Sequence, residues 1–72
     1  MKISQISGIE LIRILRKNGF VVVRQRGSHI RLEKNMPLET IKITVPNHRT
    51  LKKGTLHNIL KEANLNLEEV FE

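Results

Sequence analysis

Two stretches rich in β-branched and apolar residues, 20–25 and 28–32, stand on either side of Arg26-Gly27. Such runs are typical of β-strands, and glycine readily adopts the positive φ that a tight turn requires. The pattern therefore predicts a β-hairpin with a two-residue turn at Arg26-Gly27, although Arg-Gly is a weaker turn signal than Asn-Gly.

This turn sets a register in which Gln25 lies opposite Ser28 and Arg24 lies opposite His29. Side chains alternate between the two faces of a strand, so the hairpin divides into a core face and a basic face. The core face is predicted to hold Val21, Val23, Gln25, Ser28, Ile30 and Leu32. The other face is predicted to hold Phe20, Val22, Arg24, His29 and Arg31. An imidazole between two guanidinium groups indicates a functional site.

A helix is predicted before the hairpin, over residues 8–18. Ser7 and Glu10 have the spacing of a capping box, and an apolar stripe follows them. Asn18-Gly19 tolerates the left-handed conformation that commonly ends a helix.

A second helix is predicted over residues 53–63, where apolar side chains recur at helical spacing. Lys52 and Lys53 stand at its N-terminus, which favours anions over cations. Two lysines there suit a bound phosphate, or they are simply solvated. A short terminal helix is expected over residues 67–71.

A third strand is predicted over residues 40–45, which alternate apolar and polar side chains. Its apolar side chains join the core face, and Lys42 joins the basic face. The order α-β-β-β-α then implies an α+β two-layer sandwich, with both main helices on one face of an antiparallel sheet. The other face is open, and it carries Arg24, His29, Arg31 and Lys42.

Composition limits the chain to one small domain, because 72 residues support a single two-layer core. Cysteine is absent, which excludes disulfides and thiolate metal sites and fits a reducing cytoplasm. We find neither a signal-peptide segment nor an apolar run of about 18 residues, so we expect a cytoplasmic protein without a membrane association.

The chain carries 13 Lys and Arg against 7 Asp and Glu, a formal charge of +6. This excess favours a polyanionic partner, nucleic acid first and an acidic protein second. The alternative is a solvated basic surface that keeps the protein soluble.

The basic face suits cleavage of RNA without a metal ion or cofactor. Imidazole has a reference pKa of about 6.5, so His29 is a candidate to take the proton of a 2′-hydroxyl. Arg24, Arg31 or Lys42 are candidates to hold the phosphate. Ser28 is expected to shape the turn. The alternative is that His29 is an ordinary surface residue or a donor to phosphate.

Other classes of site are less well supported. His29, His48 and His57 are far apart in sequence, and no carboxylate is spaced to complete a metal site with them. His48 precedes the second helix and is able to approach the basic face, whereas His57 borders the apolar stripe and is expected to be structural. The second helix offers few side chains for reading DNA bases, and Phe20 alone is a candidate for stacking on them.

Three segments of the chain resemble the HicA family of toxins from type II toxin–antitoxin modules. These segments run over residues 19–29, 44–48 and 51–60, and they include Gly27-Ser28-His29 and Gly54-Thr55-Leu56. The similarity extends over essentially the whole chain.

The resemblance implies a single HicA-like domain over residues 1–72 with a fold like that of double-stranded-RNA-binding domains. It also implies metal-independent cleavage of mRNA and neutralisation by a cognate HicB-like antitoxin. The essential histidine of the family falls on His29. We therefore expect an endoribonuclease with His29 as general acid/base; its expected phosphate binders are Arg24, Arg31, Lys42, Lys52 and Lys53.

Two other functions stay open on the sequence. One is a non-catalytic RNA-binding module that uses the same basic face. The other is a degenerate toxin that only binds an antitoxin or an operator complex.

Overall fold

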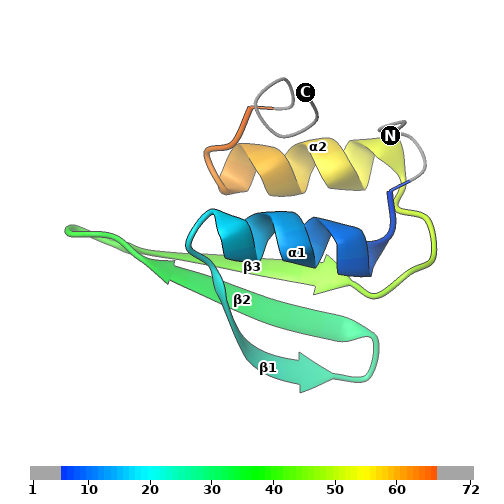
Figure 1. Cartoon of the computed structure of the whole chain (residues 1–72), viewed down its shortest axis with the longest axis horizontal. Helices are drawn as coiled ribbons and strands as arrows, with labels where there is room; N and C mark the ends of the chain where they lie inside the picture. Colours follow the sequence, from blue (N-terminus) through cyan, green and yellow to red (C-terminus); the bar gives the residue numbers. More distant parts are fainter. Residues whose placement is uncertain (1–5, 67–72) are drawn as a thin grey trace.

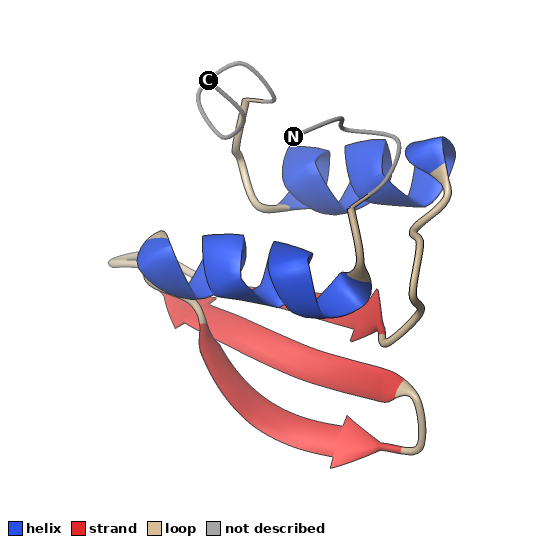
Figure 2. Cartoon of the chain, turned by 45° about the vertical axis from the view of Figure 1, so that its right-hand side comes forward, coloured by secondary structure: helices blue, strands red, loops and turns tan. Residues whose placement is uncertain are grey.

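The computed structural model describes residues 6–66, which form two helices and a three-stranded antiparallel sheet. Their order is α1 (Gly8–Lys17), β1 (Val21–Arg26), β2 (His29–Asn35), β3 (Thr40–Pro46) and α2 (Lys53–Glu62). Both helices lie on one side of the sheet, so the structure has two layers (Figures 1 and 2). The predicted α+β sandwich and its element order are confirmed.

The core lies between the helices and the two strands β2 and β3. Apolar residues alternate along these strands, and each strand therefore turns one buried row toward the helices. The buried side chains of the sheet are Ile30, Leu32, Ile41, Ile43 and Val45, and those of the helices are Leu11, Ile12, Leu15, Leu56, Ile59 and Leu60. Burying one such side chain fully stabilises a fold by about 1.5–3 kcal/mol.

The ends of α1 form as the sequence predicts. The backbone N–H of Glu10 donates to Ser7 Oγ, and the N–H of Ser7 donates to Glu10 Oε1, each over 3.1 Å. This reciprocal pair is a capping box. After the helix, Gly19 has φ +94°, a conformation that side-chain-bearing residues rarely adopt.

The start of α1 packs directly against the segment that follows β3. The N–H of Gly8 donates to the carbonyl of His48 over 2.9 Å. A Cβ atom at residue 8 would collide with the carbonyl oxygen of Pro46. Glycine is therefore required here to let the helix approach the sheet.

The predicted hairpin register is wrong by two residues, because the turn lies one residue further along the chain than predicted. The structure pairs Arg26 with His29, Gln25 with Ile30 and Arg24 with Arg31, so the turn is Gly27-Ser28. Gly27 has φ +60°. A glycine at the first of two loop residues is the preference of a type II′ turn, whereas our prediction placed it second.

The predicted division of β1 into faces is also wrong. Val21 and Val23 are exposed, and Ser28 lies in the turn instead of facing the core. Phe20 is buried, and Lys34 Nζ lies 5.8 Å from its ring centroid. Two causes are evident: the helices cover β2 and β3 but leave β1 beyond them (Figure 1), and the β1 register shifts between Val22 and Arg24.

The remaining boundaries differ little from the predicted ones. β2 continues to Asn35, past the predicted break at Lys34, and β3 includes Pro46. The terminal helix expected over residues 67–71 lies outside the described residues. Within residues 6–66, neither helix is long and apolar enough to cross a membrane.

The contact at Gly8 generates a prediction with an internal control. We expect Gly8→Ala to lower the free energy of unfolding by about 1–3 kcal/mol, because the added methyl group overpacks the junction with Pro46. Gly54, in the first turn of α2, has no atom within 4 Å of an added Cβ. Gly54→Ala should therefore leave stability unchanged or raise it by up to about 1 kcal/mol, as helix propensity dictates. Urea denaturation measures both; equal effects of the two substitutions would contradict this packing.

Candidate functional site

The uncovered face of the sheet carries a row of polar side chains from β2. His29, Arg31 and Glu33 alternate with the buried Ile30 and Leu32, so they point away from the helices. The buried row thus fixes the direction of the site residues.

Strand pairing brings further cations to this face. Arg26 pairs with His29, Arg24 pairs with Arg31, and Lys42 of β3 pairs with Glu33. Side chains of directly paired residues lie on the same face, with Cβ atoms about 4.5–5.5 Å apart. The prediction that Arg24, His29, Arg31 and Lys42 share the open face is confirmed.

Arg26 and Glu33 are members of this face that the sequence prediction left out. Arg26 was placed in the turn, and moving the turn to Gly27-Ser28 puts it opposite His29. The Gly-Ser pair was the signal for this placement. Glu33 faces Lys42, and its carboxylate gives the otherwise basic surface a negative boundary.

A shallow hollow of about 340 Å³ lies on this face. Val23, Arg24, Arg31 and Glu33 line it. Two guanidinium groups at one hollow suit an anion such as a phosphate, because each presents several donors in a fixed fork. The apolar wall formed by Val23 was not predicted.

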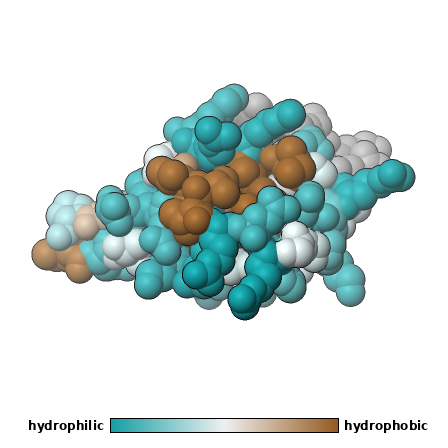
Figure 3. Space-filling view, turned by 90° about the horizontal axis from the view of Figure 1, so that it is seen from below, coloured by the Kyte–Doolittle hydropathy of each residue, from teal (hydrophilic) through white to brown (hydrophobic). Residues whose placement is uncertain are grey.

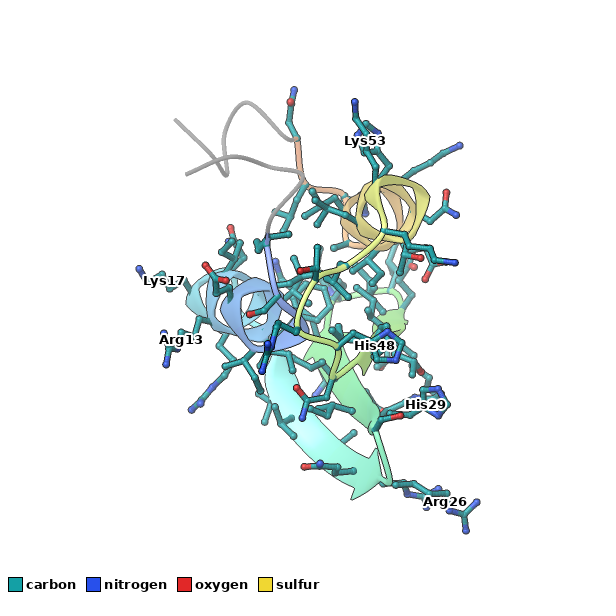
Figure 4. All side chains as sticks on the ribbon, turned by 90° about the vertical axis from the view of Figure 1, so that its right-hand side faces the viewer. Arg13, Lys17, Arg26, His29, His48 and Lys53 are labelled. Atoms are coloured by element: carbon teal, nitrogen blue, oxygen red, sulfur yellow. The ribbon has the colours of Figure 1, made fainter. Side chains whose placement is uncertain are left out.

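His48 lies close to the end of β2 that begins with His29. Pro46 pairs with His29, and the N–H of Asn47 donates to the carbonyl of Ser28 over 2.6 Å. The N–H of His48 then donates back to Pro46 over 2.9 Å. Figure 4 shows His48, His29 and Arg26 in succession on the side of the sheet away from α1. The fold therefore brings two exposed imidazoles to one end of the open face.

The two lysines at the start of α2 do not converge with His29. Lys52 is the N-cap of α2 without a side-chain capping hydrogen bond, and Lys53 points away from the sheet (Figure 4). Both side chains are exposed. They form a separate cationic pair beside the free N–H groups of the helix.

His57 is exposed on α2, where it lines a shallow hollow with Leu60 and Leu65, and its structural role stays a prediction. Among residues 6–66, no three His, Asp or Glu side chains gather closely enough to hold a metal ion. The same part of the chain buries no polar or charged side chain. The open face presents histidines, arginines, Lys42 and the carboxylate of Glu33.

Comparison with known protein families identifies the family of this chain. The family model described as the HicA toxin of bacterial toxin–antitoxin systems matches residues 8–65, from the first residue of α1 to just past α2. No curated protein and no solved structure matches the chain. The matched span includes every residue of the open face, and the resemblance seen in the sequence is confirmed. The chain belongs to the HicA toxin family, and so has the role of a toxin that is paired with a cognate antitoxin.

Proposed function

We propose that this toxin is an endoribonuclease that cleaves mRNA in the cytoplasm. The observation that carries the proposal is the position of His29 on an open sheet face. Its side chain lies opposite Arg26 and is followed by Arg31 in the same exposed row of β2. Membership of a family of RNase-type toxins supports the same reaction class.

In this proposal the arginines bind the phosphate that is attacked. Arg24 and Arg31 line one hollow and are able to grip phosphate oxygens in a bidentate manner. Lys42 extends the same face across β3. We assign Lys52 and Lys53 to phosphates further along the RNA, since Lys53 points away from the sheet (Figure 4).

The reaction is a transesterification that needs one base and one acid. His29 takes the proton of the 2′-hydroxyl while the 2′-oxygen forms a bond to the adjacent phosphorus. The bond from phosphorus to the 5′-oxygen then breaks, and that oxygen receives a proton. The products are a 2′,3′-cyclic phosphate and a free 5′-hydroxyl, and arginine stabilises the charge that develops on the phosphoryl oxygens.

We assign the proton donor of this step to His48. Its backbone is held on both sides, because its N–H donates to Pro46 and its carbonyl accepts from Gly8, each over 2.9 Å. Two imidazoles at one end of the face allow one to act as base and the other as acid. A positioned acid or base typically contributes about 10²–10⁴-fold to a rate.

The first test is cleavage of a defined mRNA in EDTA by wild-type protein and by His29→Ala. We expect the substitution to abolish cutting with the fold and RNA binding retained, because it removes the base and leaves the arginines. His57→Ala is the matched control and should cut like wild type, since His57 lies on α2. Cyclic-phosphate ends identify the reaction.

Binding without cutting by both proteins would reject the enzyme and favour the non-catalytic RNA-binding module. Toxicity that survives His29→Ala but not removal of the cations would point to sequestration of RNA.

A second test concerns His48. We expect His48→Ala to slow cleavage by about 10²–10⁴-fold with an unchanged dissociation constant for RNA. An RNA with a 5′-thio leaving group needs no protonation and should restore most of the rate. Failure of the thio substrate to rescue the variant would remove His48 from the role of acid.

A third test concerns the phosphate contacts. Arg24→Ala and Arg31→Ala should each weaken RNA binding at every sequence, and each should reduce the slope of log K against log salt by about 0.7. Lys61→Ala, in the last turn of α2, is the control and should leave that slope unchanged. Equal slopes for all three variants would place the bound RNA elsewhere.

A further inference from the structure

The free edge of β1 exposes three consecutive valines. The order of strands in the sheet is β1-β2-β3, so β1 pairs with β2 on one side and with no strand of residues 6–66 on the other. The exposed fractions of Val21, Val22 and Val23 are 61%, 41% and 51%, and Ile9 of α1 is 42% exposed. Figure 3 views the molecule from the side on which β1 lies in Figure 1, and it shows a brown apolar patch in the middle, bordered by hydrophilic side chains.

The valines lie on both faces of β1. Val22 pairs with the buried Leu32 and therefore points to the helix side, whereas Val21 pairs with Glu33 and points to the open side. Val23 lines the hollow with Arg24 and Arg31. Strands that are apolar on both faces are typical of sheets that are covered on both faces. The first half of β1 is thus apolar on both faces, although it is exposed at the edge of the sheet.

Positive charge borders the valines on both sides of the sheet. Arg24 and Arg26 follow them along β1 and point to the open side. On the helix side, Arg13 and Lys17 project from α1 away from α2 (Figure 4), and with Arg16 they line a second shallow hollow. A ligand at this edge therefore meets apolar side chains in the centre and mainly cations around them, with the carboxylate of Glu33 opposite Val21 on the open side.

We propose that the β1 edge binds a strand of another protein whose side chains alternate between apolar and acidic. Such a strand would satisfy the free N–H and C=O groups of the edge, cover the valines and place carboxylates near the arginines. The proposal does not require that His29 cleaves RNA, because it concerns the edge of β1, although the bound strand and the proposed RNA would share Arg24.

A second copy of the chain is a poor occupant of this edge. Each copy carries a formal charge of +6, so pairing two β1 edges would bring two basic borders together. The irregular pairing at Val22/Arg24 and the two arginines of β1 are also features by which edge strands avoid pairing with themselves. An acidic strand turns the same arginines into favourable partners.

The test titrates ¹⁵N-labelled protein with a capped eight-residue peptide that alternates valine and glutamate. We expect the amide chemical shifts to change and amide hydrogen exchange to slow only in β1 and in the residues next to it. Val21→Thr together with Val23→Thr should weaken the peptide by about tenfold, because threonine keeps the strand propensity but not the apolar contact. Leu38→Thr is the matched control, since Leu38 is 97% exposed and lies in the loop between β2 and β3.

Two altered peptides separate strand pairing from charge attraction. A peptide of four valines followed by four glutamates has the same charge, and it should bind at least about tenfold more weakly if side-chain alternation matters. Alternate N–H groups of a strand point to the same side, so the alternate amides of the peptide can be N-methylated in two sets. Methylation of the set that faces β1 should abolish binding, and methylation of the other set should spare it.

Several results would overturn the proposal. One is an unchanged affinity of the double valine variant, and another is an equal loss in Leu38→Thr. Concentration-dependent dimerisation through β1 without peptide would make a second copy the occupant. Valine-dependent shifts caused by a single-stranded RNA would make the edge part of the RNA surface instead.

Discussion

The structure depends on a small set of backbone hydrogen bonds where β3 ends. Asn47 donates to the hairpin turn at Ser28, and His48 accepts from Gly8 at the start of α1. The first bond joins the end of β3 to the turn between β1 and β2, and the second joins it to the helix layer. Both histidines of the proposed reaction lie within two residues of these bonds. The geometry of the site is therefore set by the main chain, which a side-chain substitution elsewhere disturbs little.

The packing of the core orients the site. On β2, His29 and Arg31 alternate with Ile30 and Leu32, and a slip of one residue would exchange the buried and exposed rows. Burial of two large apolar side chains thus holds an imidazole and a guanidinium in solvent. This arrangement lets a small protein present many cations without burying any polar side chain of residues 6–66.

The sequence predicted most of the fold because its local signals agree with one another. The capping box at Ser7 and Glu10, the alternation along β3 and the helical spacing around Leu56 each have one structural solution. The presence of both His29 and Arg31 on the open face was predicted as well, because alternate residues of one strand point to the same face.

The errors fall where tertiary structure overrides a local pattern. Val21, Val22 and Val23 predict a strand but do not show whether a helix covers it, and the bulge at Val23 changes the parity of β1. Phe20 was assigned to the open face, but it lies before that strand and packs beneath Lys34. The sequence allowed His48 to approach the basic face but did not place it beside His29, because that position depends on hydrogen bonds between segments about twenty residues apart.

The position of β1 at the margin of the sheet has a consequence for how the molecule unfolds in parts. All six residues of β1 are exposed, so β1 shelters little apolar surface and opens at low cost compared with β2 and β3. Such an opening displaces Arg24 and Arg26 while His29 stays on β2, paired with Pro46. The contribution of Arg24 to holding a phosphate is thus separable from that of Arg31, which stays on β2 beside the imidazole of His29.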